Sequence, residues 1–167
     1  MNAGCHGSDT SDVLITAVVY DATTNVVSER SPDDLDLSYR HSSLDDLEFV
    51  LEARFVTVDR DSVEGERELR EISRWRKRHQ PGGTYNAGSV FKNPPDDAAG
   101  RLIDDVGLKG FSVGGVSVSE RHANFFVAGP AATASDVHAL VMAVAERVAA
   151  ATGVELVPEI RFIGDFS

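Results

Sequence analysis

The first 60 residues carry the two-residue periodicity of β-strands. A β-branched run covers residues 13–20, and after a polar turn Val26 and Val27 can return as its partner, which predicts a β-hairpin. Residues 48–59 alternate apolar and polar side chains, which predicts a strand with one face buried and the other exposed. The apolar positions of this strand are Phe49, Leu51, Ala53 and Phe55.

A helical pattern follows. Between residues 61 and 79, Leu69, Ile72 and Trp75 recur every third residue among charged positions, which predicts a helix with one apolar stripe packed into a core. The sequence Gln-Pro-Gly-Gly at 80–83 predicts the end of this helix. We therefore place a boundary there.

The rest of the chain mixes helical and strand patterns. Apolar positions at helical spacing predict a helix within 94–107, and β-rich runs predict strands over 111–118 and 124–127. A last strand is expected over 154–163. Its apolar face would hold Val154, Leu156, Ile160 and Phe162.

A capping-box pattern marks the longest predicted helix. Thr133 and Asp136 have the spacing at which the two residues cap each other's backbone N–H groups. An Ala- and Val-rich run continues to about Ala151, and Gly153 is placed to end the helix. Helices and strands in this order indicate an α+β fold.

The chain divides into three predicted parts. Residues 1–60 are strand-rich and acidic, 61–79 form a connecting helix, and 80–167 form a compact α+β domain. A hairpin plus one strand is marginally stable alone in water. Because the chain opens with a Gly-rich loop directly before a strand, we expect a further segment to precede it.

Composition indicates which kinds of binding partner and which cellular compartment suit the chain. The formal net charge is -11, which argues against a nucleic-acid backbone as partner. No apolar run approaches the roughly 20 residues that cross a bilayer, and the first residues lack the apolar core of a signal peptide. With Cys5 as the only cysteine, the chain suits a reducing cytoplasm.

Candidate chemistry gathers in the segment Asn86 to Pro94. It reads Asn-Ala-Gly-Ser-Val-Phe-Lys-Asn-Pro, and Gly88 would let the backbone turn sharply and present Ser89 outward. No histidine stands at a telling spacing, so a hydrolase-like serine nucleophile is not supported. Judged by local chemistry alone, an ordinary surface turn remains the commoner interpretation.

This segment is similar to the signature loop of the UDP-N-acetylenolpyruvoylglucosamine reductases. The family's other motifs follow in the same order and at similar spacing over nearly the whole chain. They are Tyr39-Arg40-His41-Ser42 upstream, and Ala99 to Asp104, Gly114 to Ser119, His122 to Phe125 and Pro158 to Gly164 downstream. Each match alone is weak, and the set together is specific.

The resemblance implies a flavin-dependent reductase. In this family NADPH reduces FAD, and the flavin then passes a hydride to C3 of the enolpyruvyl group while a proton is delivered to C2. By resemblance, Ser89 is the general acid at C2, Arg40 binds the substrate carboxylate, and Glu159 helps to stabilise the intermediate. Considered without the family, Arg40 and Glu159 are ordinary solvated charges.

Binding residues are also implied by resemblance. The expected substrate-binding residues are Asn93, Lys92, His122 and Lys77, although His122 is as readily a structural histidine. The expected flavin-contacting residues are Asn2, Ala3, Gly4 and Gly7. No metal ligand is expected.

Two departures from the family qualify these expectations. The stretch before the signature loop is short, as in the subclass that lacks an inserted tyrosine loop. The first domain and much of the second, which hold the flavin pyrophosphate, have no counterpart here. The resemblance thus predicts the C-terminal substrate-binding domain plus the end of an FAD-binding domain, in a chain that is truncated, binds FAD poorly and is inactive alone.

A second hypothesis belongs to a different class. The chain would be a non-catalytic module, derived from the reductase, that binds a UDP-sugar or a partner protein. The joint presence of Ser89, Arg40 and Glu159 argues for the reductase.

Overall fold

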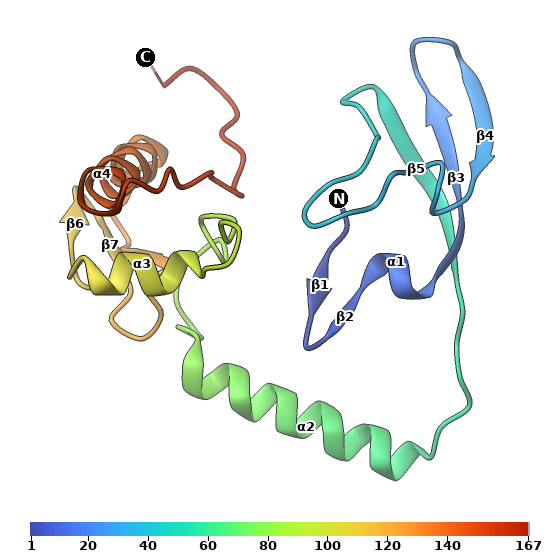
Figure 1. Ribbon diagram of the computed structural model, residues 1–167, viewed down its shortest axis with the longest axis horizontal. Helices are drawn as coiled ribbons and strands as arrows, with labels where there is room; N and C mark the ends of the chain where they lie inside the picture. The colour runs from blue at the N-terminus through green and yellow to red at the C-terminus, as the bar shows by residue number, and fades with distance from the viewer. Residues whose placement is uncertain (167) are drawn as a thin grey trace. The chain divides into compact units, whose positions relative to one another are not determined.

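The computed structural model describes residues 1–166, and the chain divides into two compact units between Asp61 and Ser62. Both units combine short antiparallel sheets with helices (Figure 1), which confirms the predicted α+β class. No helix within the described residues is long and apolar enough to cross a membrane.

The first unit opens with a small hairpin. β1 (Gly4–Cys5) pairs with β2 (Ser8–Asp9), and the two turn residues His6 and Gly7 have φ of 53° and 82°. Positive φ at both positions is the geometry of tight hairpin turns that match the strand twist. A single helical turn, α1 (Thr10–Val13), leads into the main sheet.

A three-stranded antiparallel sheet forms the body of the first unit. β3 (Leu14–Asp21) lies between β4 (Val26–Arg30) and β5 (Glu48–Phe55), so the predicted hairpin and the third strand are both confirmed. The core of this unit is small. Its fully buried apolar residues are Ala17, Val19 and Leu35.

The prediction that β5 is half buried is wrong. Phe49, Leu51 and Phe55 remain 51%, 60% and 49% exposed. Their alternation is that of a strand with a covered face, but the packing within residues 1–61 reaches only Ala17, Val19 and the loop around Leu35. The apolar face of β5 therefore lies open in this unit.

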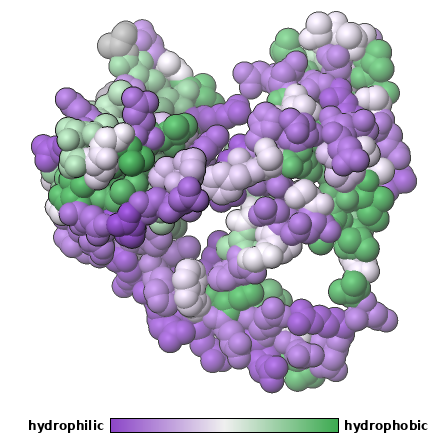
Figure 2. All heavy atoms as spheres, in the orientation of Figure 1, coloured by the Kyte–Doolittle hydropathy of each residue, from purple (hydrophilic) through white to green (hydrophobic). Residues whose placement is uncertain are grey.

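The second unit begins with α2 (Ser62–His79), which has the predicted bounds but not the predicted burial. No residue of α2 is buried, and Leu69 and Trp75 are 65% and 42% exposed. The surface of this helix is mostly hydrophilic (Figure 2). Trp75 stacks on His79 at 4.6 Å, one turn away, so the interpretation of this stripe as core is wrong.

The core of the second unit lies between a small sheet and two helices. The sheet order is β6 (Ser112–Val113), β7 (Val116–Val118) and β8 (Phe126–Ala128), all antiparallel. α4 (Ala134–Thr152) packs against β6, β7 and α3 (Ala99–Asp105). The largest fully buried side chains of this unit are Phe91, Ile103, Leu140, Val90, Val116, Val118, Val141, Val144 and Val148.

The ends of α4 follow the predicted signals. Thr133 Oγ1 accepts from the backbone N–H of Asp136 at 3.1 Å, and Asp136 Oδ2 accepts from that of Thr133 at 2.9 Å. The N–H of Thr133, and after it the N–H of Gly115, donate to the Asp136 carboxylate and lower its pKa. Gly153 ends the helix with φ of 75°, a conformation that glycine adopts without steric cost.

Two predicted strands take other forms. Residues 111–118 contain a hairpin whose turn includes Gly115, where an added Cβ would lie 2.7 Å from the backbone of Ala132. Residues 154–163 form no strand beyond one bridge between Phe91 and Pro158. Proline has no N–H to donate, which limits a ladder there. The predicted apolar face of this segment nevertheless packs on the core.

The difference between the two helices is testable. Leu140→Ala should destabilise the second unit by about 2–5 kcal/mol, because Leu140 is fully buried in α4. Leu69→Ala, on the exposed face of α2, should change stability by less than about 0.5 kcal/mol. Urea unfolding followed by far-UV circular dichroism measures both, and equal losses would contradict the assignment of the core.

Candidate functional site

The signature segment begins with a turn shaped by Asn86 and Gly88. Asn86 Oδ1 accepts from the backbone N–H of Gly88 at 3.1 Å, while Asn86 Nδ2 donates to the carbonyl of Pro81 at 3.0 Å. Gly88 has φ of 81°, which confirms the predicted sharp turn. Ser89 follows directly, half-buried, where the chain becomes extended.

Backbone hydrogen bonds hold the next residues from two sides. On one side the N–H of Val90 donates to the carbonyl of Asn124 at 2.9 Å. On the other, the N–H of Glu159 donates to the carbonyl of Val90 at 2.7 Å, and Lys92 donates to Val157 at 2.9 Å. The fold thus brings the backbones of residues 89–92, Asn124 and Glu159 together from distant parts of the sequence.

The side-chain contact between Asn124 and Phe91 was not predicted from the sequence. The Asn124 side chain is almost fully buried, its Oδ1 accepts from the N–H of Phe91 at 2.9 Å, and its Nδ2 donates to the carbonyl of Phe91 at 2.8 Å. Residues 124–127 were predicted only as a strand. The available signal was an asparagine within an apolar run, since a buried amide needs polar partners.

His122 lies next to this contact. Its Nδ1 accepts the backbone N–H of Asn124 at 3.3 Å, and its ring meets Phe125 edge-on at 4.8 Å between centroids. Burial lowers the pKa of His122, and the positive charge of Lys109 acts in the same direction. With Nδ1 accepting, the neutral ring carries its proton on Nε2.

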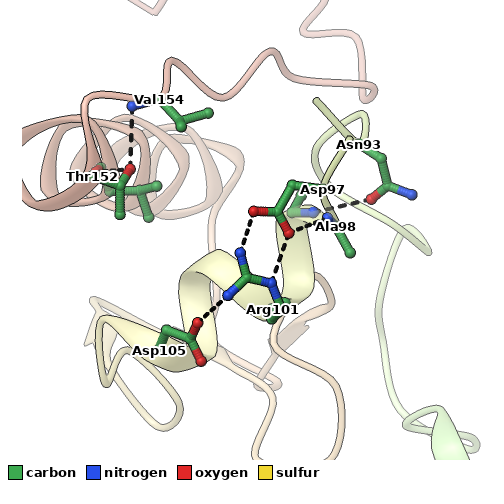
Figure 3. Close-up of polar contacts among 9 residues, drawn as sticks. Asn93, Asp97, Ala98, Arg101, Asp105, Thr152 and Val154 are labelled. Carbon is green, nitrogen blue, oxygen red and sulfur yellow. Dashed lines mark hydrogen bonds and ion pairs between the residues drawn. The ribbon is translucent and has the colours of Figure 1, made fainter. Parts of the chain in front are cut away.

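Asn93 takes part in the fold at the start of α3. Its Oδ1 accepts from the N–H of Ala99 at 3.0 Å (Figure 3), which satisfies one of the unpaired donors of the first helical turn. Arg101 in turn pairs with Asp97, which precedes α3, and with Asp105 at the end of the helix.

Lys77 lies in the last turn of α2, and its backbone carbonyl is bonded to Arg121, which lines a polar cavity. The carbonyls of Lys77 and Gln80 accept from Arg121 Nη1 at 3.1 and 3.2 Å, which ties the end of the helix to the loop after β7. The cavity has a volume of about 440 Å³, within the roughly 300–1,000 Å³ of small-molecule sites. Its polar lining includes Thr84, Ser117, Ser119, Glu120 and Arg121.

The other predicted residues belong to the first unit. The Asn2 side chain is buried against Ser11, with Oδ1 accepting its N–H at 2.9 Å and Nδ2 donating to its Oγ at 3.0 Å. The backbone of Asn2 bridges Tyr39, whose ring lies 5.0 Å below the guanidinium carbon of Arg40. Arg40 has φ of 55°. The fold thus brings Arg40 close to the loop predicted to contact flavin.

Ala3, Gly4 and Gly7 complete that loop. The carbonyl of Ala3 accepts from the N–H of Thr10 at 2.9 Å, and Gly7 occupies the tight turn. A Cβ added at Gly4 would lie 1.5 Å from a carboxylate oxygen of Asp9. Among the residues that the structure describes, no group of three or more His, Cys, Asp or Glu side chains is placed to hold a metal ion.

Comparison with known proteins identifies the family. Residues 80–163 match the family model for the C-terminal domain of UDP-N-acetylenolpyruvoylglucosamine reductase. The chain belongs to this family. The matched range contains the Ser89 turn, Asn124 and Glu159, so the described contacts lie within the family domain.

Similar proteins carry the same name. The chain is 38% identical over 166 residues to the UDP-N-acetylenolpyruvoylglucosamine reductase of Caldanaerobacter subterraneus subsp. tengcongensis, covering 99% of this chain and 55% of that protein. It is 43% identical over 173 residues to the reductase of Heliobacterium modesticaldum, covering 99% and 53%. The chain therefore spans about half the length of the curated relatives it matches.

A solved structure agrees with the family. The crystal structure of the Thermus caldophilus UDP-N-acetylenolpyruvylglucosamine reductase matches 96% of this chain and 57% of its own, with a TM-score of 0.82 and 35% identity. This match confirms the resemblance from which the fold was predicted.

The environment of His122 predicts that the stability of the fold depends on pH. Because burial lowers its pKa in the folded state, protonation favours unfolding. The contribution of His122 to stability should be fully present above the unfolded pKa of about 6.5 and be lost as pH falls through the folded value.

The measurement compares the wild type with His122→Gln, which cannot titrate. The difference between their free energies of unfolding should shrink as the pH falls from 7.5 to 5.5. The slope of this change with pH is set by the one proton that His122 binds on unfolding. An NMR titration of the ring gives the folded pKa directly. A value at or above 6.5 would contradict the prediction.

Proposed function

We propose that this chain supplies the substrate-binding part of a UDP-N-acetylmuramate dehydrogenase, an NADPH- and FAD-dependent oxidoreductase of peptidoglycan precursor synthesis in the cytoplasm. The observation that carries the proposal is the Ser89 segment, held between Asn124 and Glu159 inside the matched family domain. The substrate is UDP-N-acetylglucosamine enolpyruvate.

Each proposed catalytic residue has a stated part. Ser89 delivers a proton to C2 of the enolpyruvyl group, and a serine hydroxyl needs polar neighbours to do so because it is a weak acid. Glu159 follows Pro158 on the segment bound to Val90, so its carboxylate starts from a backbone fixed beside Ser89. Arg40 binds the substrate carboxylate, for which its permanent charge and planar donors are suited.

The substrate's nucleotide is proposed to bind beside the end of α2. The polar cavity there is bounded by Arg121 and by the loop that begins at Pro81, and Lys77 lies in the adjoining helical turn. Cations suit a diphosphate in an otherwise acidic protein. Lys92 and Asn93 lie on or next to the Ser89 segment and are proposed to contact the diphosphate or the sugar ring. His122, bonded to Asn124, is proposed to contact the substrate.

The residues present do not by themselves fit FAD. Gly4 faces the carboxylate of Asp9, which repels a pyrophosphate, and the Asn2 side chain is engaged by Ser11. We propose that the flavin is held mainly by a preceding FAD-binding segment, joined to this chain or supplied separately. Such a segment also accounts for the open apolar face of β5.

A non-catalytic module that binds a UDP-sugar is the second candidate. It is favoured by one observation, that the polar cavity lies wholly within the second unit, which has its own large core. Such a module would bind UDP-N-acetylglucosamine as tightly as the assembled reductase and would gain no activity from a flavin-binding segment.

Flavin binding separates these candidates. The 167-residue chain should bind FAD weakly or not at all in a fluorescence titration, because the described residues hold too little of a flavin site. With the flavin-binding segment supplied, the complex should bind FAD and oxidise NADPH in the presence of the enolpyruvyl substrate. Tight binding of FAD by the short chain would refute this account of the cofactor.

The role of Ser89 is tested in the assembled reductase. Ser89→Ala should lower the rate of substrate reduction by about 10²–10⁴, as expected for a lost general acid. The rate of flavin reduction by NADPH should not change, because no proton at C2 is involved. Ser112→Ala, on exposed β6, is the matched control. Full activity of Ser89→Ala would remove Ser89 from the mechanism.

A further inference from the structure

We propose that Asn124 is a positioning residue that holds Ser89 in place through the backbone of Phe91. The inference rests on the proposed function, since it assigns a task only if Ser89 delivers the proton. Asn124 itself lies behind the segment, contacts its backbone and is not a proton donor to the substrate.

The Asn124 side chain makes the two hydrogen bonds that the backbone of a neighbouring strand would otherwise make to Phe91. The main chain of Asn124 already pairs with this segment, through its carbonyl to Val90 and the bridge between Ser89 and Phe125. The side-chain amide then makes both hydrogen bonds of the next pairing, at 2.9 and 2.8 Å to the N–H and carbonyl of Phe91. An amide offers the same donor and acceptor as a peptide group.

A side chain is needed because the backbone turns away. The N–H of Phe125 donates to the carbonyl of His122 at 2.9 Å, so the chain before Asn124 bends in a turn and cannot continue beside Phe91. The N–H and carbonyl of Phe91 lie in the interior, where unpaired polar groups are costly. The Asn124 side chain supplies both partners at the point where the strand ends.

Core packing and His122 also hold the contact between Asn124 and Phe91 in place. Asn124 is 3% exposed, Phe91 is 1% exposed, and the two flanking aromatic rings Phe91 and Phe126 meet edge-on at 6.0 Å. The N–H of Asn124 is held by His122 Nδ1. Movement of the amide away from Phe91 would therefore disturb the core, so the contact limits displacement of the segment that carries Ser89.

The opposite side of the segment cannot replace this contact. There the N–H of Glu159 and the carbonyl of Val157 bind Val90 and Lys92, and Pro158 between them has no N–H. Without Asn124 the polar groups of Phe91 would turn toward water, and Ser89, two residues earlier, would shift with them. A displacement of about 1 Å at a reacting group is enough to lower a rate roughly 100-fold.

Three variants separate positioning from general stability. Asn124→Ala removes both hydrogen bonds, and Asn124→Asp keeps the shape and the acceptor. Val144→Ala, in the fully buried face of α4, lowers stability without removing a hydrogen bond of the segment. In the 167-residue chain, Asn124→Ala should speed amide hydrogen exchange at Phe91 roughly tenfold or more beyond the global change, as for a lost hydrogen bond. Val144→Ala should change exchange only globally.

Kinetics in the assembled reductase give the second readout. Asn124→Ala should lower kcat for the enolpyruvyl substrate at least about tenfold with little change in KM, and leave flavin reduction by NADPH unchanged. Asn124→Asp should recover activity as its carboxyl becomes protonated, since a carboxylic acid both donates and accepts. This variant carries the test if Asn124→Ala does not fold.

The outcomes are distinguishable. If both Asn124 variants match Val144→Ala in exchange and in kcat, the positioning role is wrong. If Ser89→Ala keeps full activity, the proposed function of Ser89 is wrong, whatever the exchange data show. Loss of kcat in Ser89→Ala and Asn124→Ala, with pH-dependent recovery in Asn124→Asp, supports both.

Discussion

The arrangement of the candidate site depends on one short extended segment that is hydrogen-bonded on both sides. Residues 89–92 receive backbone and side-chain bonds from Asn124 and backbone bonds from 157–159. Neither flanking segment is a regular strand at this point, so the pairing is irregular and specific to these residues. A serine on such a segment keeps its position at little entropic cost, which is what a group that must meet a reacting carbon requires.

The two units differ in how much apolar surface they bury. The second unit encloses a core that runs from Val90 through α3, the small sheet and α4 to Leu156. The first unit buries three apolar side chains and leaves the large ones of β5 open to solvent. Hydrophobic burial is the main favourable term in folding, so the second unit has its own source of stability, whereas the first leaves the apolar face of its sheet exposed.

The residues of the proposed site are divided between the two units. The proposed proton donor, its backbone partners and the polar cavity all belong to the well-packed unit. The residues proposed for the substrate carboxylate and the flavin, Arg40 and the loop from Asn2 to Gly7, belong to the thinly packed one. A preceding flavin-binding segment that packs on β5 would stabilise the second set of residues and complete the cofactor site.

Local signals in the sequence determined much of the secondary structure and the family. The capping box at Thr133, the stop at Gly153, the turn at Gly88 and the bounds of α2 all follow from contacts within a few residues, so they could be predicted from the chain alone. Periodicity also identified the apolar face of residues 154–163. The ordered motifs from Tyr39 to Gly164 predicted the reductase family, which the comparisons confirmed.

Burial and partnership were decided only by the tertiary structure. The stripes of β5 and α2 look like core faces, but a periodic pattern states which side chains could be covered and not whether anything covers them. Two predicted strands are interrupted. Pro158 has no backbone N–H to donate to a neighbouring strand, and the glycines before Val116 form a hairpin turn within the predicted strand. The role of Asn124 depends on a contact with Phe91 across 33 residues, and no local pattern specifies which backbone a buried amide will meet.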